Sequence, residues 1–314
     1  KEIKKIYGLS NSFEIKSIFK NPKKYSFIDR VKFAFFCNKK IGSESLIVSR
    51  SIITSIFLAY HKKKNNLEIH HNLQSLTNII FQLRNFFTNK KYLNFILIHK
   101  NLIKKLDVKR DRYIILDDAV DINNFKKIKS KETNECVYTG SLLQGKGIEI
   151  IEKLADLNPK IKFNIYGDIN GISFDKLKIL KKRNMYFNNH VNYSKIPRIL
   201  SKHRILLMPY QKKVYGIGKN LELGQFMSPM KMFDYLASGK IILASDLKIY
   251  KHILKNNMNS FLINSEDIDR WNYILKKIFY SKNKYKSIRN NALKTATKHT
   301  WIKRSQKIIK FNKV

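Results

Sequence analysis

The chain has 314 residues, 43% of them hydrophobic and 12% aromatic, which is enough to bury the cores of two ordinary domains. Its 5 Pro and 11 Gly exclude collagen-like and low-complexity classes, and its 2 Cys exclude a disulfide framework or a four-cysteine zinc site. The longest uncharged apolar stretch, residues 51–60, is about half of the roughly 20 residues that a membrane-spanning helix needs. We therefore expect a cytoplasmic protein without a transmembrane span.

The net charge of +40 would suit a polyanion such as nucleic acid. However, 52 of the 63 basic residues are Lys, they are scattered along the whole chain, and no nucleic-acid-binding motif is present. We interpret most of this charge as solvated surface and do not expect a nucleic-acid partner. If the charge is functional, an anionic membrane surface is the better target, since each interfacial Lys contributes about 1 kcal/mol.

Short apolar runs at 45–48, 66–70, 95–99 and 112–116 predict strands separated by helical stretches. After a polar stretch at 123–134, a second series predicts strands at 136–139, 162–166, 204–208, 241–244 and 261–263. This alternation indicates an α/β fold with two Rossmann-like, doubly wound parallel sheets, and the polar stretch marks the boundary between them.

Three helix signals stand out in the second half. One helix is expected to start with a capping Ser228, to carry Pro229 in its first turn and to end before Gly239. Another should start at 265–267, where acidic residues suit the helix dipole. Two amphipathic helices between 284 and 311 should meet near His299.

Two segments could bind an anion where a strand gives way to a helix. In 138–147 (YTGSLLQGKG), the small residues Gly140, Ser141 and Gly147 would let the backbone approach an oxyanion, and Lys146 adds positive charge. Taken alone, this segment is better explained as an ordinary strand-to-helix turn, since such turns commonly contain Gly.

The other segment is 228–235 (SPMKMFDY). It would bring free backbone N–H groups near Met230 together with Lys231 at a helix start. Asp234 is either an acceptor for a sugar diol or a surface helix charge.

Five runs in order change this balance: YTGSLLQGKG at 138–147, IYGD at 165–168, ILLMPY at 205–210, SPMKMFDYLASGKIILASD at 228–246 and TWIKR at 300–304. Together they resemble the C-terminal domain of GT-B glycosyltransferases of glycosyltransferase family 4. Upstream, LEIH at 67–70 and LDDAVDINNF at 116–125 look like segments of the family's acceptor domain and crossover. The resemblance covers the chain from about residue 45 onward, with a thinner parallel at 7–9.

The resemblance implies two Rossmann-like domains that face each other across a cleft. Residues 1–126 would form the acceptor-side domain, 127–296 the nucleotide-sugar-binding domain, and 297–314 a helix that returns to the first domain. The family's opening strand, Gly-rich loop and helix would precede residue 1, so the first domain is expected to be incomplete. Whether the chain is active without them is left open.

The implied reaction is transfer of a hexose-type sugar, with retention, from a nucleotide diphosphate sugar to a glycan or lipid-linked acceptor. Bacterial cell-surface polysaccharide or lipopolysaccharide synthesis, peripheral to the inner face of the cytoplasmic membrane, is the expected setting. By this resemblance no metal or other cofactor is required. The donor itself is the co-substrate.

Residue roles follow from the same resemblance. The donor site comprises Gly140, Ser141, Lys146, Gly147, Ser228, Met230, Lys231 and Asp234, with Asp234 on the ribose and the lysines on the diphosphate. His190 and Val191 would contact the base, and His70 with Glu68 would lie beside the transferred sugar.

The chain departs from the family pattern at three positions, one of which is Asp234, shorter than the usual Glu but able to make the same contact. Ser141 stands where the family commonly has Arg, and Phe226 stands where the first acid of its carboxylate pair is expected. His70 could instead be a packing histidine. Two other functions remain open: an inactive GT-B fold that binds a polyanion, nucleic acid or a membrane surface, and a sugar phosphorylase that uses the same phosphate sites.

Overall fold

The computed structural model describes residues 26–313 apart from 43–44, 74, 88, 107, 127, 129, 169–182, 217–221 and 282–283; before residue 26 it describes 4, 6, 14–16 and 18. The resemblance noted at 7–9 lies outside the described residues. The chain divides into two compact units. Unit 1 contains Asp118–Lys303, and unit 2 consists of Asn11–Asp117 and Arg304–Val314. The chain passes from unit 2 to unit 1 after Asp117, before the boundary expected at 126. It returns to unit 2 after Lys303, beyond the boundary expected at 296.

Unit 2 is a parallel α/β unit whose four-stranded sheet has the order β1-β2-β3-β4. Its elements in chain order are α2 (Phe27–Lys40), β1 (Ile47–Ser49), α3 (Ile52–Tyr60), β2 (Asn65–Ile69), α4 (Ser75–Phe87), β3 (Leu93–Leu97), α5 (Ile103–Leu106), β4 (Tyr113–Ile115) and most of α13 (Trp301–Lys313).

Both faces of the β1–β4 sheet are covered by helices. Neighbouring residues of β3 point to opposite faces: the ring of Phe95 meets that of Phe81 in α4 at 5.7 Å between centroids, whereas Ile96 packs against Ile308 of α13. Asn312, one turn further along α13, exchanges hydrogen bonds with Asn66 of β2 at 3.0 and 3.1 Å. The last helix therefore completes the core of unit 2.

Unit 1 has a six-stranded parallel sheet of order β10-β9-β8-β5-β6-β7. Its elements are α6 (Asn123–Lys126), β5 (Thr133–Thr139), α7 (Ile148–Leu157), β6 (Phe163–Tyr166), β7 (Met185–Asn188), α9 (Ile196–Lys202), β8 (His203–Met208), α10 (Met230–Ser238), β9 (Ile241–Ser245), β10 (Phe261–Ile263), α11 (Ile268–Phe279) and α12 (Lys286–Ala296).

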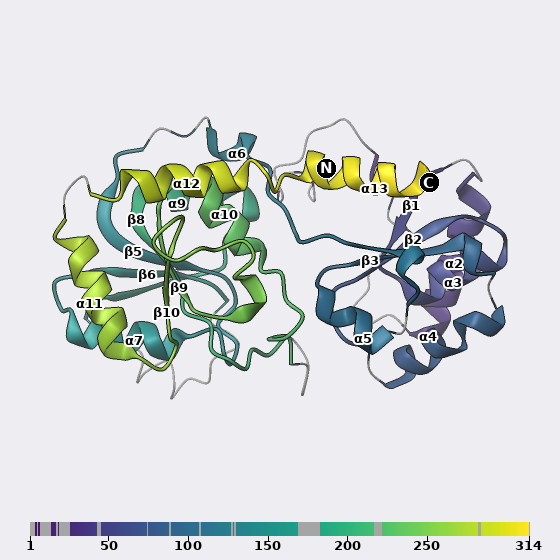
Figure 1. The fold of residues 1–314 in the computed structure, drawn as a ribbon, viewed down its shortest axis with the longest axis horizontal. Coiled ribbons are helices and arrows are strands. Elements are labelled where there is room, and N and C mark those ends of the chain that lie inside the picture. The colour runs from purple at the N-terminus through teal and green to yellow at the C-terminus, as the bar shows by residue number, and fades with distance from the viewer. Residues whose placement is uncertain are drawn as a thin grey trace. The chain divides into compact units, whose positions relative to one another are not determined.

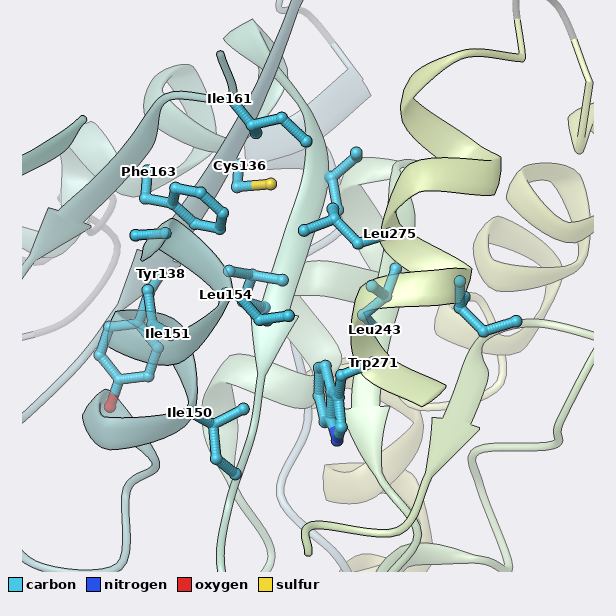
Figure 2. Packing of buried hydrophobic residues seen from close by; sticks show 14 of the residues in the cluster. Cys136, Tyr138, Ile150, Ile151, Leu154, Ile161, Phe163, Leu243, Trp271 and Leu275 are labelled. Atoms are coloured by element: carbon cyan, nitrogen blue, oxygen red, sulfur yellow. The ribbon is translucent and has the colours of Figure 1, made fainter. Parts of the chain in front are cut away.

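The core of unit 1 lies in two layers, one on each face of this sheet. Helices α7 and α11 cover one face of the sheet, and α9, α10 and α12 cover the other (Figure 1). Alternate residues of the strands enter different layers: Tyr138 belongs to the cluster with α7 and α11, and its neighbour Val137 to the cluster with α9, α10 and α12. Figure 2 shows the first layer, where Trp271 and Leu275 of α11 pack beside Leu243 of β9. Continuous apolar strands of this kind are typical of a sheet that is buried on both faces.

The nine strands expected from the sequence are confirmed, with ends that differ by up to three residues. One strand, β7, was not expected. The helix expected from Ser228 begins instead at Met230, Pro229 is its N-cap, and Ser228 is not a capping residue. Its hydroxyl oxygen accepts a hydrogen bond from the backbone N–H of Asp118 at 3.0 Å. At the next helix, α11, the capping residue is Asp267.

Among the described residues, no helix is long and apolar enough to cross a membrane.

Candidate functional site

The candidate site of unit 1 lies where the order of the strands reverses. From β5 the chain adds β6 and β7 on one side, then returns to add β8, β9 and β10 on the other. Loops leave the carboxyl ends of β5 and β8 in opposite directions at such a point, which opens a crevice where α/β sheets commonly bind ligands. The loop after β5 leads to α7 and contains Gly140 and Lys146, and α10 follows β8.

Gly140 and Lys231 approach each other closely at this point of the sheet. Gly140 has φ +134°, and a Cβ atom placed on it would lie 2.9 Å from Lys231 Nζ. The Lys231 ammonium group also lies over the Tyr138 ring, 3.6 Å from its centroid. A side chain at position 140 would therefore displace the ammonium group, which explains why glycine occupies this position.

Lys146 and Lys231 lie beside the same aromatic ring. Their Nζ atoms are 4.8 and 5.0 Å from the centroid of Tyr210. Lys231 Nζ is buried and makes no hydrogen bond to any described residue. Burial lowers the pKa of Lys146 to about 8, and burial together with the charge of Lys146 lowers the pKa of Lys231 well below its usual value. Within the described part of the chain, no carboxylate offsets these two effects on the lysine pKa values.

The N-terminus of α10 adds to this positive potential. Its first N–H groups carry partial positive charge, and Lys231 is the second residue of the helix. A cation at this end of a helix is disfavoured, as is an ammonium group removed from water. An anion bound between the two lysines would relieve both effects at once.

Asp234 is buried rather than displayed on the surface, so the surface-charge interpretation is wrong. Its Oδ1 accepts a 2.7 Å hydrogen bond from the hydroxyl of Tyr193. Burial raises the pKa of Asp234 to about 7, although the Tyr193 hydrogen bond acts in the opposite direction. Any ligand hydroxyl that bonds this carboxylate would share it with Tyr193.

The remaining donor-site candidates lie around the same loops. Ser141 is exposed and its carbonyl accepts a 2.7 Å bond from the Tyr138 hydroxyl; Gly147 is the N-cap of α7; and Met230, the first residue of α10, is exposed. His190 is exposed and Val191 half-buried in the loop after β7.

Unit 2 brings its two candidate residues into direct contact. His70 Nε2 lies 2.5 Å from Glu68 Oε1, and the same oxygen accepts a 3.0 Å bond from Arg304 of α13. Burial raises the pKa of Glu68, but the hydrogen bond from His70 and the charge of Arg304 outweigh it and lower that pKa overall. Glu68 is therefore an anion that holds the imidazole. His71, by contrast, is exposed.

The sequence analysis did not identify three tyrosines that contact the candidate site residues. Tyr138 and Tyr210 lie inside the quoted runs, yet nothing in those runs shows that both rings face the lysines. Tyr193 lies 41 residues before Asp234, so its hydrogen bond follows from the fold alone. Phe226, at the position of the family's first acid, is buried.

No group of three or more His, Cys, Asp or Glu side chains that could hold a metal ion occurs in the described part of the chain.

The two parallel-sheet units are those of the GT-B fold, and solved structures share it. HepE of Anabaena, solved in complex with UDP, superposes with a TM-score of 0.70 over 90% of this chain and 81% of its own, at 13% identity. A glycosyltransferase of Rickettsia africae gives 0.69 over 95% and 83%, also at 13% identity. Sucrose-phosphate synthase of Thermosynechococcus elongatus gives 0.69 over 93% and 81%, at 10% identity.

The sequence matches the family model of glycosyl transferases group 1 over residues 120–295, and the chain belongs to that family. It is also 22% identical over 190 residues to TuaH of Bacillus subtilis (strain 168), whose name describes a glycosyltransferase of teichuronic acid biosynthesis. That match covers 55% of this chain and 44% of TuaH, so it spans less than half of that relative.

Proposed function

We propose that this protein transfers a hexose-type sugar, with retention of anomeric configuration, from a nucleotide diphosphate sugar to a glycan or lipid-linked acceptor, as a member of glycosyltransferase family 4. Unit 1 binds the donor, and the Glu68–His70 pair of unit 2 lies beside the transferred sugar. His70 donates or accepts one hydrogen bond at a sugar hydroxyl, while Glu68 fixes its ring.

One observation carries the donor assignment: Lys146 and Lys231 lie around the Tyr210 ring, and the buried Lys231 ammonium group has no hydrogen-bond partner among the residues that the structure describes. The leaving group of this reaction is a nucleoside diphosphate, whose negative charge grows as the glycosidic bond breaks. Fixed cations and helix N-termini stabilise such charge without reorganising. A diphosphate also supplies an anion for both lysines.

The other candidates take supporting roles. The backbone at Gly140, Ser141 and Gly147 approaches the phosphates, and Ser228 and Met230 hold the start of α10 against them. Asp234 binds the ribose diol, and the backbone at His190 and Val191 contacts the base. The lysines supply the positive charge that a metal ion provides in other transferases, so we expect turnover without added metal.

The relatives suggest which donor and which pathway to test first. HepE was crystallised with UDP, which makes a uridine diphosphate sugar the first candidate donor. TuaH is named for teichuronic acid biosynthesis, which favours bacterial surface polysaccharide as the product. The site of action is then the cytoplasmic face of the membrane.

The test is a thermal-shift screen with UDP-, GDP- and ADP-sugars. A ligand that binds only the native state raises stability by RT ln(1 + [L]/Kd), so the true donor raises Tm. Lys146→Ala should abolish the shift, whereas Lys153→Ala, an exposed position on the same helix α7, should retain it. His70→Ala should keep most of the shift and lose turnover.

An undiminished shift in Lys146→Ala would disprove the donor site. Absence of any nucleotide-sugar shift in the parent protein, with salt-dependent binding of polyanions instead, would overturn the transferase function.

A further inference from the structure

Unit 2 contains a pocket of about 850 Å³ beside the Glu68–His70 pair. It lies at the carboxyl ends of β1 and β2, where Arg50 and His70 directly follow the strands. Its volume is within the range of pockets that enclose a whole small ligand. The transfer chemistry proposed above needs only a sugar hydroxyl near His70, so a pocket of this size calls for a second explanation.

Most of the wall is apolar. Aliphatic and aromatic side chains line it from α2, α3, α4 and the loop after β2, among them Phe27, Phe33, Ile53, Leu73 and Leu76. Phe27 and Leu76 remain 53% and 57% exposed, so a large apolar area borders the opening. A glycan has a hydroxyl group on nearly every carbon, and these groups would find no hydrogen-bond partners on an apolar wall. A hydrocarbon chain would bury it favourably.

The pocket is lined by two arginines and two acids, and among the described residues only the acids are held by neighbouring groups. Only 11 of the 63 basic residues of the chain are Arg, yet two of them, Arg30 and Arg50, line this pocket. Both are exposed, and neither forms an ion pair with a described carboxylate. A guanidinium group binds a phosphate through two parallel hydrogen bonds, which a Lys ammonium group cannot do.

The two acids of the pocket are already engaged. Asp29 accepts hydrogen bonds from the backbone and hydroxyl of Ser26 at 3.0 and 2.7 Å in a capping box of α2. Glu68 is held between His70 and Arg304. The first turns of α2, α3 and α4 also contribute residues to the wall, and their dipoles add positive potential. The pocket therefore combines an apolar wall with a site that attracts anions.

We propose that this pocket binds the acceptor, and that the acceptor is an amphiphile: an apolar chain against the Phe and Leu wall, with a phosphate at Arg30 and Arg50. The proposal rests on the proposed function, because it is His70 that makes the occupant an acceptor. It narrows the choice between a free glycan and a lipid-linked acceptor to a lipid phosphate.

The test is a binding titration of the full chain with farnesyl monophosphate below its micellar concentration, without donor. The parent protein should bind farnesyl monophosphate at least tenfold more tightly than farnesol, which lacks the phosphate. The double variant Arg30→Gln/Arg50→Gln should lose at least tenfold in affinity. Arg110→Gln, an exposed Arg of unit 2 outside the pocket, should match the parent.

A second pair of variants tests the apolar wall. Leu76 and Leu83 are both exposed residues of α4, but only Leu76 lines the pocket. Leu76→Ser should weaken farnesyl monophosphate binding severalfold, and Leu83→Ser should not. Equal affinities for farnesyl monophosphate and farnesol, or equal losses in the two serine variants, would overturn the assignment. So would unchanged binding in the double Arg variant.

The thermal shift with the donor sugar distinguishes a failure of the pocket assignment from a failure of the proposed transferase function. The double Arg variant should keep the full thermal shift with the donor sugar. If the parent protein binds farnesyl monophosphate as described but shows no donor shift, the pocket stands and the transferase function falls. A normal donor shift with no farnesyl monophosphate binding would instead overturn the pocket assignment and leave the transferase function in place.

Discussion

Lys231 is the residue whose environment departs most from what its side chain prefers. Its ammonium group lies over the Tyr138 ring, close to Lys146 and to the N-terminus of its own helix, with no hydrogen-bond partner among the described residues. Contact with an aromatic face compensates part of the lost hydration, since a desolvated cation gains about 2 kcal/mol from such a ring. Burial of this ammonium group therefore has a free-energy cost that an anionic ligand would remove.

We predict that Lys231→Met stabilises the ligand-free protein by about 1 kcal/mol at pH 7, because it removes an unpaired polar group from a buried position. The pKa of Lys231 is lowered in the folded state, so the unfolded chain binds more protons and wild-type stability rises with pH up to the usual lysine pKa. The advantage of the variant should shrink accordingly towards pH 10. Urea unfolding at several pH values measures this.

Lys248→Met is the matched control, because Lys248 is exposed in the same unit. Its effect should stay within about 0.5 kcal/mol at every pH. A Lys231→Met protein that is less stable than the parent would show that the ammonium group has a stabilising partner.

At the scale of elements, the sequence predicted most of the strands because buried parallel strands consist of short apolar runs bounded by turn residues. Met185–Asn188 escaped prediction because asparagines at 184, 188 and 189 surround its apolar residues, and clustered Asn is typical of a turn. The error at Ser228 has another cause: Ser228 has the composition of an N-cap, but the amide that it binds belongs to Asp118, 110 residues earlier. Local patterns predict elements well and long-range partners poorly.

In the candidate site, too, residues within local motifs could be predicted and their distant partners could not. Lys146, Lys231 and Asp234 could be selected from motifs at helix starts. The contacts of both lysines with the Tyr210 ring, and the hydrogen bond from Tyr193 to Asp234, could not be predicted. They join loops that are far apart in the sequence and that only the folded sheet brings together. Glu68 and His70 are two residues apart, so their contact could be expected from the sequence. Arg304, which also binds Glu68, is 236 residues away from it and could not be predicted.

The turn into α7 offers a test at this scale. Gly147 has φ +85°, and a Cβ atom there would lie 1.8 Å from the carbonyl oxygen of Pro209. We predict that Gly147→Ala destabilises unit 1 by about 3 kcal/mol or more, since both the backbone conformation and the contact must change. Urea unfolding followed by far-ultraviolet circular dichroism, which reports both units, would measure the loss.

Gly42→Ala provides the comparison. A Cβ atom at Gly42 meets nothing nearer than Ser45 Oγ at 3.8 Å, and its φ lies outside the left-handed region. That variant should be neutral or slightly stabilising. Similar losses in both variants would mean that glycine content, rather than the geometry at 147, sets the cost.

At the scale of the molecule, each unit has its own core. The chain contains 2 Trp, and both lie in unit 1: Trp271 is fully buried and Trp301 is 36% exposed. In a Trp301→Phe background, fluorescence therefore reports the unfolding of unit 1 through Trp271 alone, whereas far-ultraviolet circular dichroism reports both units.

We predict that Phe81→Ala in this background moves only part of the dichroism transition. Phe81 is fully buried in unit 2, where it packs against Phe95 and the guanidinium group of Arg84 lies 3.9 Å from its ring centroid. The cavity should cost unit 2 about 3 to 5 kcal/mol and leave the Trp271 midpoint unchanged. Leu154→Ala in unit 1 should move the Trp271 midpoint. Coincident shifts of both probes in either variant would indicate a single cooperative transition instead.

The chain leaves unit 2 after Asp117 and rejoins it at Arg304, and Arg304, Ile308 and Asn312 each complete a contact with its sheet. During synthesis on the ribosome, the four strands of that sheet emerge early yet must wait for nearly two hundred further residues before α13 can dock. The stretch Asp118–Lys303 of unit 1 contains all six strands of its sheet and can fold before α13 is complete. We therefore expect the nascent β1–β4 sheet of unit 2 to be the part of this protein that depends most on a chaperone.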